Sequence, residues 1–459
     1  MIRNLARWIC FHILIVVFSI LITLPACAFW SAQGEGCSID LGGSIRSTAA
    51  GIRNYDDPLL FGWNNDYDGS SQSILRITST GDLPHDASFE IHLLGEVFST
   101  SANQGSSFAG SSFSEPFPKQ YRITRGSWEL AEDDDFSTSL DADRLNIKYT
   151  FSDLDITLGR QAVNFSQAYF WNPLDVFLAF DPETFDRDYK PGIDALRADL
   201  TLGNFSGLTL VAAPGREMEI DHYVFDAGVF PGPVNMYGSA FIARFGTNIR
   251  DFDLTIQGGK IYGGYQIGWG FSGEVFDAGI RGEASYVLAH PDGSKLIMNP
   301  LYPAGLQEID LVKDHYSVVV GTDYRFDNSL YVNLEYLFNS AGKTGSLNET
   351  LLRSMISNTK SLGRHLAGLQ LSYEIHALLT GQVACIYSFS DRSSMVSPTA
   401  TYSVADEAEF SAGAILGFGK RPTTFNMFSA NGVTFNIGEL NSEFGTYPNV
   451  FFMEFKFYF

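Results

Sequence analysis

Alternation of apolar and polar residues constrains the fold of this chain more than any other feature of its sequence. Near the C-terminus, Phe451, Met453, Phe455, Phe457 and Phe459 occupy every second position, with Glu454, Lys456 and Tyr458 between them. Successive side chains of a strand point to opposite faces, so this run has one apolar and one polar face. Runs of about ten such residues recur along the chain, for example at 144–151 and 330–339. We therefore predict an all-β protein.

The segments between these runs distinguish a transmembrane barrel from a soluble sandwich, whose strands are usually about five or six residues long. Short segments alternate with long ones. The short ones lie near 82–86, 152–154, 203–204, 248–250, 274–275, 328–329 and 375–376, and the long ones near 49–71, 99–140, 164–191, 214–236, 290–313, 340–363 and 391–404. Short periplasmic turns and long extracellular loops give this alternation in antiparallel up-and-down barrels.

Counting the runs gives the size of the predicted barrel. A further short turn near 261–263, on the outer side, breaks the alternation. With it, the connections separate sixteen runs between residues 37 and 420. The last strand, at 448–459, must descend if both ends are periplasmic, so we place one further ascending strand within 423–440. Because barrels of this kind close with an even number of strands, we predict 18 strands, with 16 as the alternative. A barrel of this size can enclose an aqueous lumen, whereas about eight strands would fill it with side chains.

The N-terminus has the pattern of an export signal. Arg3 and Arg7 precede a long apolar run, and the small residues around Cys27 fit a cleavage site. We assign 1–28 to a signal peptide and 29–459 to the barrel. The residues before Cys27 also fit a lipidation box, so lipidation of this cysteine stays open.

The charge of the chain limits its partners. Its net charge at pH 7 is −22, which argues against nucleic acid, because phosphate backbones bind basic surfaces. An acidic exterior suits divalent-cation bridging to outer-membrane lipid, and it would bias a pore toward cations. Loops that carry charge only for solubility explain the same balance. The sequence does not define an oligomeric state.

Two parts of the sequence resemble outer-membrane families. The alternating aromatics Phe455, Phe457 and Phe459 resemble the recognition signal of outer-membrane barrels, which implies the barrel-assembly machinery as a partner. The stretch 158–197, with Phe170-Trp171-Asn172-Pro173-Leu174-Asp175 inside it, resembles porin-like barrels of Gram-negative bacteria related to the alginate-export group. This resemblance implies a porin-like fold and channel function in the outer membrane, without identifying the solute.

The long segment 164–191 is the candidate constriction loop. It carries many large apolar residues, which a loop exposed to solvent seldom does, so we expect it to fold into the lumen and narrow the pore. A lid packed over the rim is the alternative. The candidate constriction residues are Trp171, Asp175, Asp181, Asp186, Arg187, Asp188 and Lys190. Their charges would filter solutes.

Charged residues on the polar faces of the predicted strands form a second set. Facing hydrocarbon, an Arg or Lys near the midplane would cost about 2–4 kcal/mol, so these residues are expected to face the lumen. They are Lys148, Arg197, Asp199, Arg244, Arg281, Glu283, Asp323, Arg325, Glu335, Glu454 and Lys456. Structural ion pairs between strands and direct roles in permeation both remain open. Arg160 breaks the pattern, because it shares a face with Ile156 and Leu158.

The sequence therefore predicts a channel for diffusion of small hydrophilic solutes, needing no cofactor. A substrate-specific transporter or exporter of a carbohydrate or organic solute is one alternative, with loop aromatics forming a stacking surface. A barrel lipid hydrolase is another, although no nucleophile motif, metal-ligand pair or phosphate loop stands out. Asp314-His315 and Asp221-His222 are the residues that could be imagined in such an enzyme.

Overall fold

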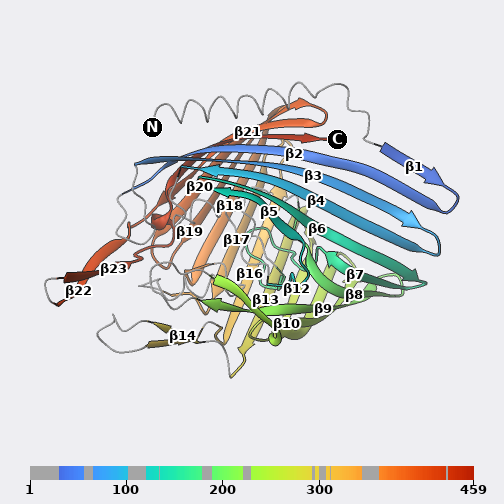
Figure 1. Ribbon diagram of the computed structural model, residues 1–459, viewed down its shortest axis with the longest axis horizontal. Coiled ribbons are helices and arrows are strands. Elements are labelled where there is room, and N and C mark those ends of the chain that lie inside the picture. Colours follow the sequence, from blue (N-terminus) through green and yellow to red (C-terminus); the bar gives the residue numbers. More distant parts are fainter. Residues whose placement is uncertain are drawn as a thin grey trace.

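Eighteen antiparallel strands form one sheet that closes on itself in the computed structural model (Figure 1). The structure describes residues 30–55, 66–101, 120–133, 135–177, 189–220, 229–291, 295–298, 307–310, 312–343, 361–430 and 433–459. The predicted all-β barrel of 18 strands is confirmed. The proposed signal peptide at 1–28 lies outside the described residues. Within the described ranges, no helix has the length and apolar character needed to cross a membrane.

The barrel strands follow one another around the wall in chain order. They are β2 (Cys37–Arg53), β3 (Tyr67–Leu83), β4 (Ala87–Thr100), β6 (Phe136–Phe151), β7 (Leu154–Gln161), β8 (Ile193–Leu202), β9 (Ser206–Ile220), β10 (Val229–Ile249), β11 (Phe252–Ile261), β12 (Gly264–Val275), β13 (Ala278–Ala289), β16 (His315–Arg325), β17 (Tyr331–Asn339), β18 (His365–His376), β19 (Leu379–Ser388), β20 (Ser393–Ala405), β21 (Ala408–Phe418) and β24 (Asn449–Tyr458).

The remaining elements lie outside this ring. β1 (Trp30–Gly34) pairs with the start of β2, and β5 (Ser127–Asp133) pairs with the outer part of β6. β14 (Lys295–Met298) with β15 (Gln307–Asp310), and β22 (Thr423–Ala430) with β23 (Val433–Glu439), form separate two-stranded sheets at the long-loop end of the barrel (Figure 1, left). A short 3₁₀ helix, η1 (Phe444–Thr446), precedes β24.

The last strand closes the barrel against the first. β24 pairs with both β2 and β21, and the ladder ends where Gly43 and Phe459 exchange two backbone hydrogen bonds of 2.8 and 3.0 Å. A Cβ at Gly43 would lie 2.6 Å from the Phe459 ring. Gly43 therefore leaves room for the terminal aromatic ring to pack against the wall.

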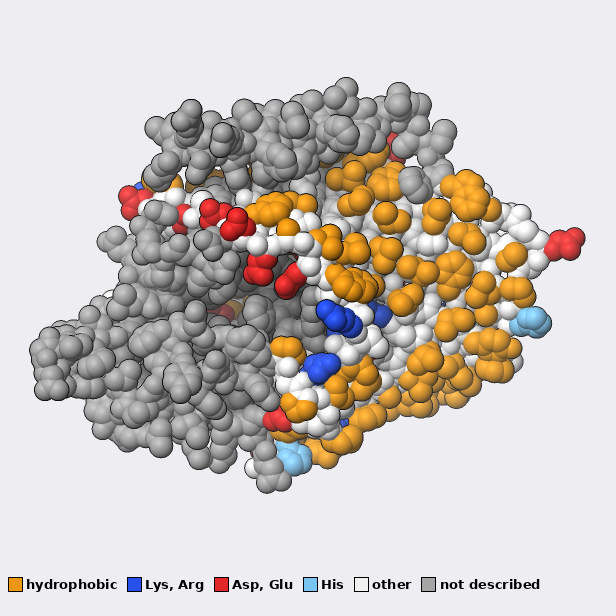
Figure 2. Space-filling model, in the orientation of Figure 1, with side chains coloured by type: hydrophobic (Ala, Val, Ile, Leu, Met, Phe, Trp, Pro, Cys, Tyr) orange, Lys and Arg blue, Asp and Glu red, His pale blue; other side chains and the backbone are white. Residues whose placement is uncertain are grey.

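The two faces of the wall differ as the alternation predicts. On β12, Tyr265, Ile267 and Trp269 are 52–58% exposed on the outer face, whereas Gln266 between them is 6% exposed on the inner face. Hydrophobic side chains cover the visible outer wall (Figure 2, right). Apolar groups at these positions suit hydrocarbon, and the backbone groups that lipid cannot satisfy are paired in the ladder.

The last quarter of the chain corrects the strand assignment. Residues 391–404, expected as a long loop, contain barrel strand β20, which follows a short turn after β19. The expected strand within 423–440 is instead the β22–β23 hairpin, outside the barrel. The two errors cancel, so the total of 18 was right although one predicted strand was wrong and one strand of the barrel was missed.

Residues 120–126, named here the rim wedge, fill a gap in the outer rim. β8 and β9 pair only up to Leu196 and Ala212. Above that point, the amide of Asp194 donates to the carbonyl of Tyr121 (2.9 Å) and the amide of Arg216 to that of Gln120 (2.9 Å). Only β5, which follows the rim wedge, forms a hairpin extension on β6, and the wedge itself belongs to the wall.

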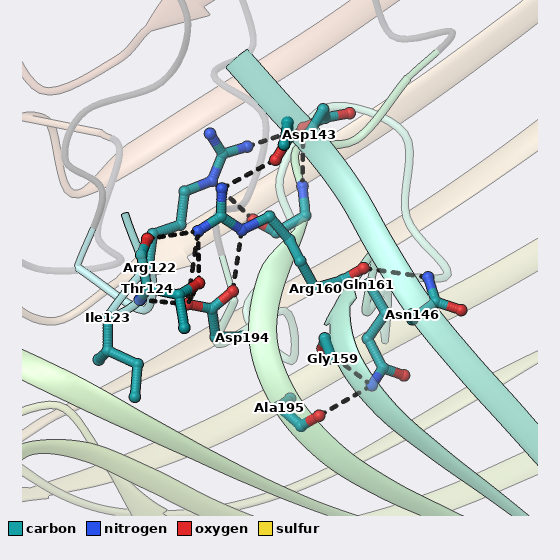
Figure 3. Close-up of polar contacts among 12 residues, drawn as sticks. Arg122, Ile123, Thr124, Asp143, Asn146, Gly159, Arg160, Gln161, Asp194 and Ala195 are labelled. Carbon is teal, nitrogen blue, oxygen red and sulfur yellow. Dashed lines mark hydrogen bonds and ion pairs between the residues drawn. The ribbon is translucent and has the colours of Figure 1, made fainter. Parts of the chain in front are cut away.

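The rim wedge explains why Arg160 breaks the alternation. Its guanidinium donates to Asp194 (2.8 Å) and to the carbonyls of Ala142 and Thr124 (each 2.8 Å), and the residue is 4% exposed (Figure 3). Arg160 therefore occupies an outward-facing position of β7 without contacting lipid, because the rim wedge covers it at the outer end of the strand.

Two apolar clusters line the inner face toward the outer end, where the sequence predicted a wet surface. One joins β8–β11 and β13 to residues 163–177, and the other joins β2, β16–β21 and β24 to Phe170, Trp171 and Phe444. Inward side chains such as Val319 and Leu366 are at most 1% exposed. They are apolar because protein segments, rather than water, cover them.

Candidate functional site

Residues 162–177, named here the inward segment, leave the end of β7 and lie against the inner face of the opposite wall. Two wall carboxylates hold them. Glu283 on β13 accepts the backbone amides of Gln167, Ala168 (3.1 Å) and Leu174 (3.1 Å). Glu335 on β17 accepts those of Tyr169 (2.6 Å) and Phe170 (2.7 Å). Five backbone donors of a segment without regular structure are satisfied in this way.

Other wall residues bind the carbonyls of the same segment. Arg244 donates to the carbonyl of Phe165, Gln257 to that of Leu174 (2.7 Å), and Gln266 to that of Pro173 (3.0 Å). These donors lie on β10, β11 and β12, which are consecutive strands of the wall. The inward segment is therefore bound across the lumen side of the barrel, with five of its amides and three of its carbonyls paired to wall side chains.

Glycines on the wall make room for the apolar side chains of the inward segment. A Cβ on Gly368 would lie 2.5 Å from the Phe170 ring, and one on Gly268 would lie 2.4 Å from the Leu174 side chain. Phe170, Trp171 and Phe177 are 2%, 5% and 0% exposed. These rings are packed against protein, so they offer no free stacking surface for a sugar.

A buried ion pair joins the two described ends of the β7–β8 loop. The Lys190 ammonium contacts the Asp175 carboxylate, which also accepts the amide of Phe177 (3.3 Å). Burial raises the pKa of Asp175 and lowers the pKa of Lys190, and the attraction between the two groups opposes both shifts. Because both side chains are buried, the pair contributes to loop packing and not to the solvated wall.

Three of the seven candidate constriction residues, Trp171, Asp175 and Lys190, are thus placed by the structure, and all three are buried. The other four, Asp181, Asp186, Arg187 and Asp188, lie outside the described residues. Their contribution to a constriction stays a prediction.

The predicted lumen charges mostly lie in contact with one another. Arg281 binds Asp323 (2.6 Å) and Glu335 (2.9 Å) across β13, β16 and β17. The other ion pairs are Arg197 with Asp199 (2.6 Å), Lys148 with Asp155 (3.8 Å), Arg325 with Glu374 (3.2 Å) and Lys456 with Glu454 (3.7 Å). Glu283 and Arg244 differ from these, because they bind the backbone of the inward segment.

Toward the short-turn end, the inner faces of β2–β8 line an open pocket of about 510 Å³. Its six charged residues are Asp40, Asp82, Glu90, Arg144, Lys148 and Arg197. Three are acidic and three basic, so the net charge of −22 is not concentrated on this part of the wall. The described pocket carries no cation bias of its own.

Sequence reasoning missed a buried carboxylate at the rim. Asp143, 0% exposed, accepts from Arg76 (2.8 Å), from Arg122 (2.7 Å) and from the amide of Gly192 (3.1 Å). It occupies a bulge between β4 and β6, where His92 pairs with Arg144 and Leu93 with Ala142. Alternation alone cannot locate such a residue, because the bulge shifts the register.

Little supports the hydrolase alternative in the described residues. Asp314 accepts the amide of Ala289 (2.8 Å), and the His315 ring contacts the carbonyl of Lys313 (2.7 Å). Both side chains therefore form hydrogen bonds with backbone groups at the rim of the barrel. Asp221 and His222 lie outside the described residues. Among the residues that the structure describes, no cluster of three or more His, Cys, Asp or Glu could hold a metal ion.

Comparison with solved structures identifies the class to which this fold belongs. OccD3 (OpdP) of Pseudomonas aeruginosa matches with a TM-score of 0.50 and 10% identity, over 95% of this chain and 93% of its own. OccAB2 of Acinetobacter baumannii matches with a TM-score of 0.53 and 10% identity, over 92% and 98%. OpdK of Pseudomonas aeruginosa, solved with vanillate, matches with a TM-score of 0.50 and 10% identity, over 93% and 100%.

These neighbours are outer-membrane porins, so the chain has the fold of an integral outer-membrane β-barrel of the porin type. At 10% identity the likeness extends to the fold and not to individual site residues. No family model matches the sequence, and no curated protein is significantly similar to it.

Proposed function

We propose that this protein is an outer-membrane channel through which small hydrophilic solutes diffuse, with the inward segment narrowing the pore. The observation that carries the proposal is the attachment of residues 162–177 to Glu283 and Glu335. These two carboxylates belong to a wall that faces lipid on its other side. A segment held there occupies part of the cross-section that a solute crosses.

The chemistry of the described lumen supports diffusion rather than catalysis. Polar and charged side chains line the pocket near the short-turn end, and removal of the hydrocarbon barrier is all that diffusion requires. The porin-type neighbours favour a channel over an enzyme. The balanced charges of the pocket favour weak ionic selectivity near the short turns, so any cation preference would come from the loops.

A specific transporter for an organic solute remains the alternative function. OpdK, one of the fold neighbours, was solved with vanillate. In this chain four of the five aromatic rings of the inward segment are at most 5% exposed and the fifth, Tyr169, is partly buried, which favours the general channel.

Swelling of liposomes that contain the folded protein tests the proposal. Sugars of increasing size should enter at rates that fall with size and do not saturate. A variant that lacks residues 172–186 should admit larger sugars. Saturation by one solute at low concentration would favour the specific transporter, and swelling rates and size limits unchanged by the deletion would contradict the role of the inward segment.

A further inference from the structure

The two carboxylates that hold the inward segment have different charged partners. Glu335 is 0% exposed and lies 2.9 Å from the Arg281 guanidinium. Glu283 is 1% exposed, and in the described part of the chain no Lys, Arg or His nitrogen lies within 4.0 Å of its carboxylate. Its hydrogen bonds come from three backbone amides of the inward segment.

We propose that Glu283 is a proton-operated latch: its protonation in mild acid releases the inward segment from β13 and alters the conductance of the pore. This inference rests on the proposed channel function and adds its regulation. Glu335 keeps residues 169–170 attached, and it is bound in turn by the Arg281 guanidinium. The switch therefore loosens one side of the segment and does not detach all of it.

The physical reason is the number of amides that one carboxylate satisfies. An ionised carboxylate only accepts hydrogen bonds, and its charge strengthens each of them. A protonated carboxyl carries an O–H of its own and accepts more weakly. Three amides converge on Glu283, so its protonation leaves donors in a dry contact without adequate acceptors. After protonation, the released segment in the aqueous lumen therefore has a lower free energy than the segment attached to β13.

The charged groups around Glu283 leave its carboxylate without an ion-pair partner among the described residues. Asp175 of the inward segment repels the Glu283 carboxylate and is itself bound to Lys190. Arg244 on β10 attracts Glu283 from beyond ion-pair distance and is engaged with the Phe165 carbonyl. Arg281, which lies on β13 with Glu283, forms ion pairs with Asp323 on β16 and with Glu335 on β17. β12 places uncharged residues, Gln266 and two glycines, in this region.

Single-channel recording between pH 7.5 and pH 5 tests the latch. The wild-type channel should become noisier as the pH falls, with one midpoint. Glu283→Gln should be noisy at every pH, because its amide permanently presents N–H groups to the backbone donors. Glu374→Gln is the matched control: it removes an exposed carboxylate whose partner is Arg325 and not the inward segment, and it should keep the wild-type midpoint. A wild-type trace without pH dependence, or a Glu283→Gln channel that titrates like wild type, would overturn the proposal.

Amide hydrogen exchange separates failure of the latch from failure of the channel. At pH 7.5, the amides of Gln167, Ala168 and Leu174 should exchange at least roughly tenfold faster in Glu283→Gln than in wild type. At pH 5 the two proteins should converge. If no conductance occurs at any pH, the channel function fails, and the exchange data still decide the latch. Equal exchange in both proteins at pH 7.5 would reject it.

Discussion

Replacement of Asp143 by Asn should destabilise the barrel more than any exposed charge change. This carboxylate is fully buried and accepts from two guanidiniums and one amide, at 2.7–3.1 Å. Hydrogen bonds to a charged group contribute about 1.5–3 kcal/mol each. Arg122 keeps a second carboxylate partner, Asp141, at 2.6 Å, and Arg76 keeps its contact with the Tyr189 ring at 4.1 Å. The net loss should therefore be about 3–5 kcal/mol, the range for breaking a buried pair.

Urea unfolding in lipid vesicles, followed by tryptophan fluorescence, measures this loss. Glu374→Gln is the control, because its pair with Arg325 is exposed, with side chains 56% and 62% accessible. Such a pair contributes about 0–1 kcal/mol. If Asp143→Asn and Glu374→Gln unfold at the same urea concentration, Asp143 does not hold the rim together as argued.

Three further predictions concern the wall. Gly368→Leu should displace Phe170 and change single-channel conductance while the barrel still folds, whereas Gly51→Leu, with nothing within 4 Å of its Cβ, should leave conductance unchanged; equal currents would contradict the packing. Ile267→Arg, at a position 58% exposed on the outer face, should cost about 2–4 kcal/mol in vesicle unfolding if it lies near the midplane, and no loss would mean that it does not face lipid. Phe459→Ala should lower the folded fraction in the outer membrane, seen as loss of the heat-modifiable band on gels. Normal assembly of this variant would contradict the predicted role of Phe459 as a recognition signal.

The outline of the fold could be predicted because one property, alternation, is repeated in every strand. The errors fell where the local sequence gives another signal. β20 contains Pro398 among Ser and Thr residues, a composition typical of loops, yet it pairs on both edges. The Asn-Gly pair at 431–432 is a hairpin signal, and it outweighs the alternation that predicts a single strand within 423–440.

The candidate site was only partly accessible from the sequence. Alternation assigned Glu283 and Glu335 to the inner face, and the apolar residues of 164–191 predicted a packed loop. The pairing of these carboxylates with loop amides joins residues more than 100 positions apart, as between Gln167 and Glu283. No local pattern encodes such a contact. Asp143 escaped detection for a second reason, because it stands at a bulge.

Conductance across a planar lipid bilayer tests the central claim most directly. The folded protein should insert in discrete, uniform current steps in concentrated KCl, with at most a weak preference for either ion. Folded protein that enters the bilayer and gives no steps would show that the barrel is sealed, and the channel account would then be wrong.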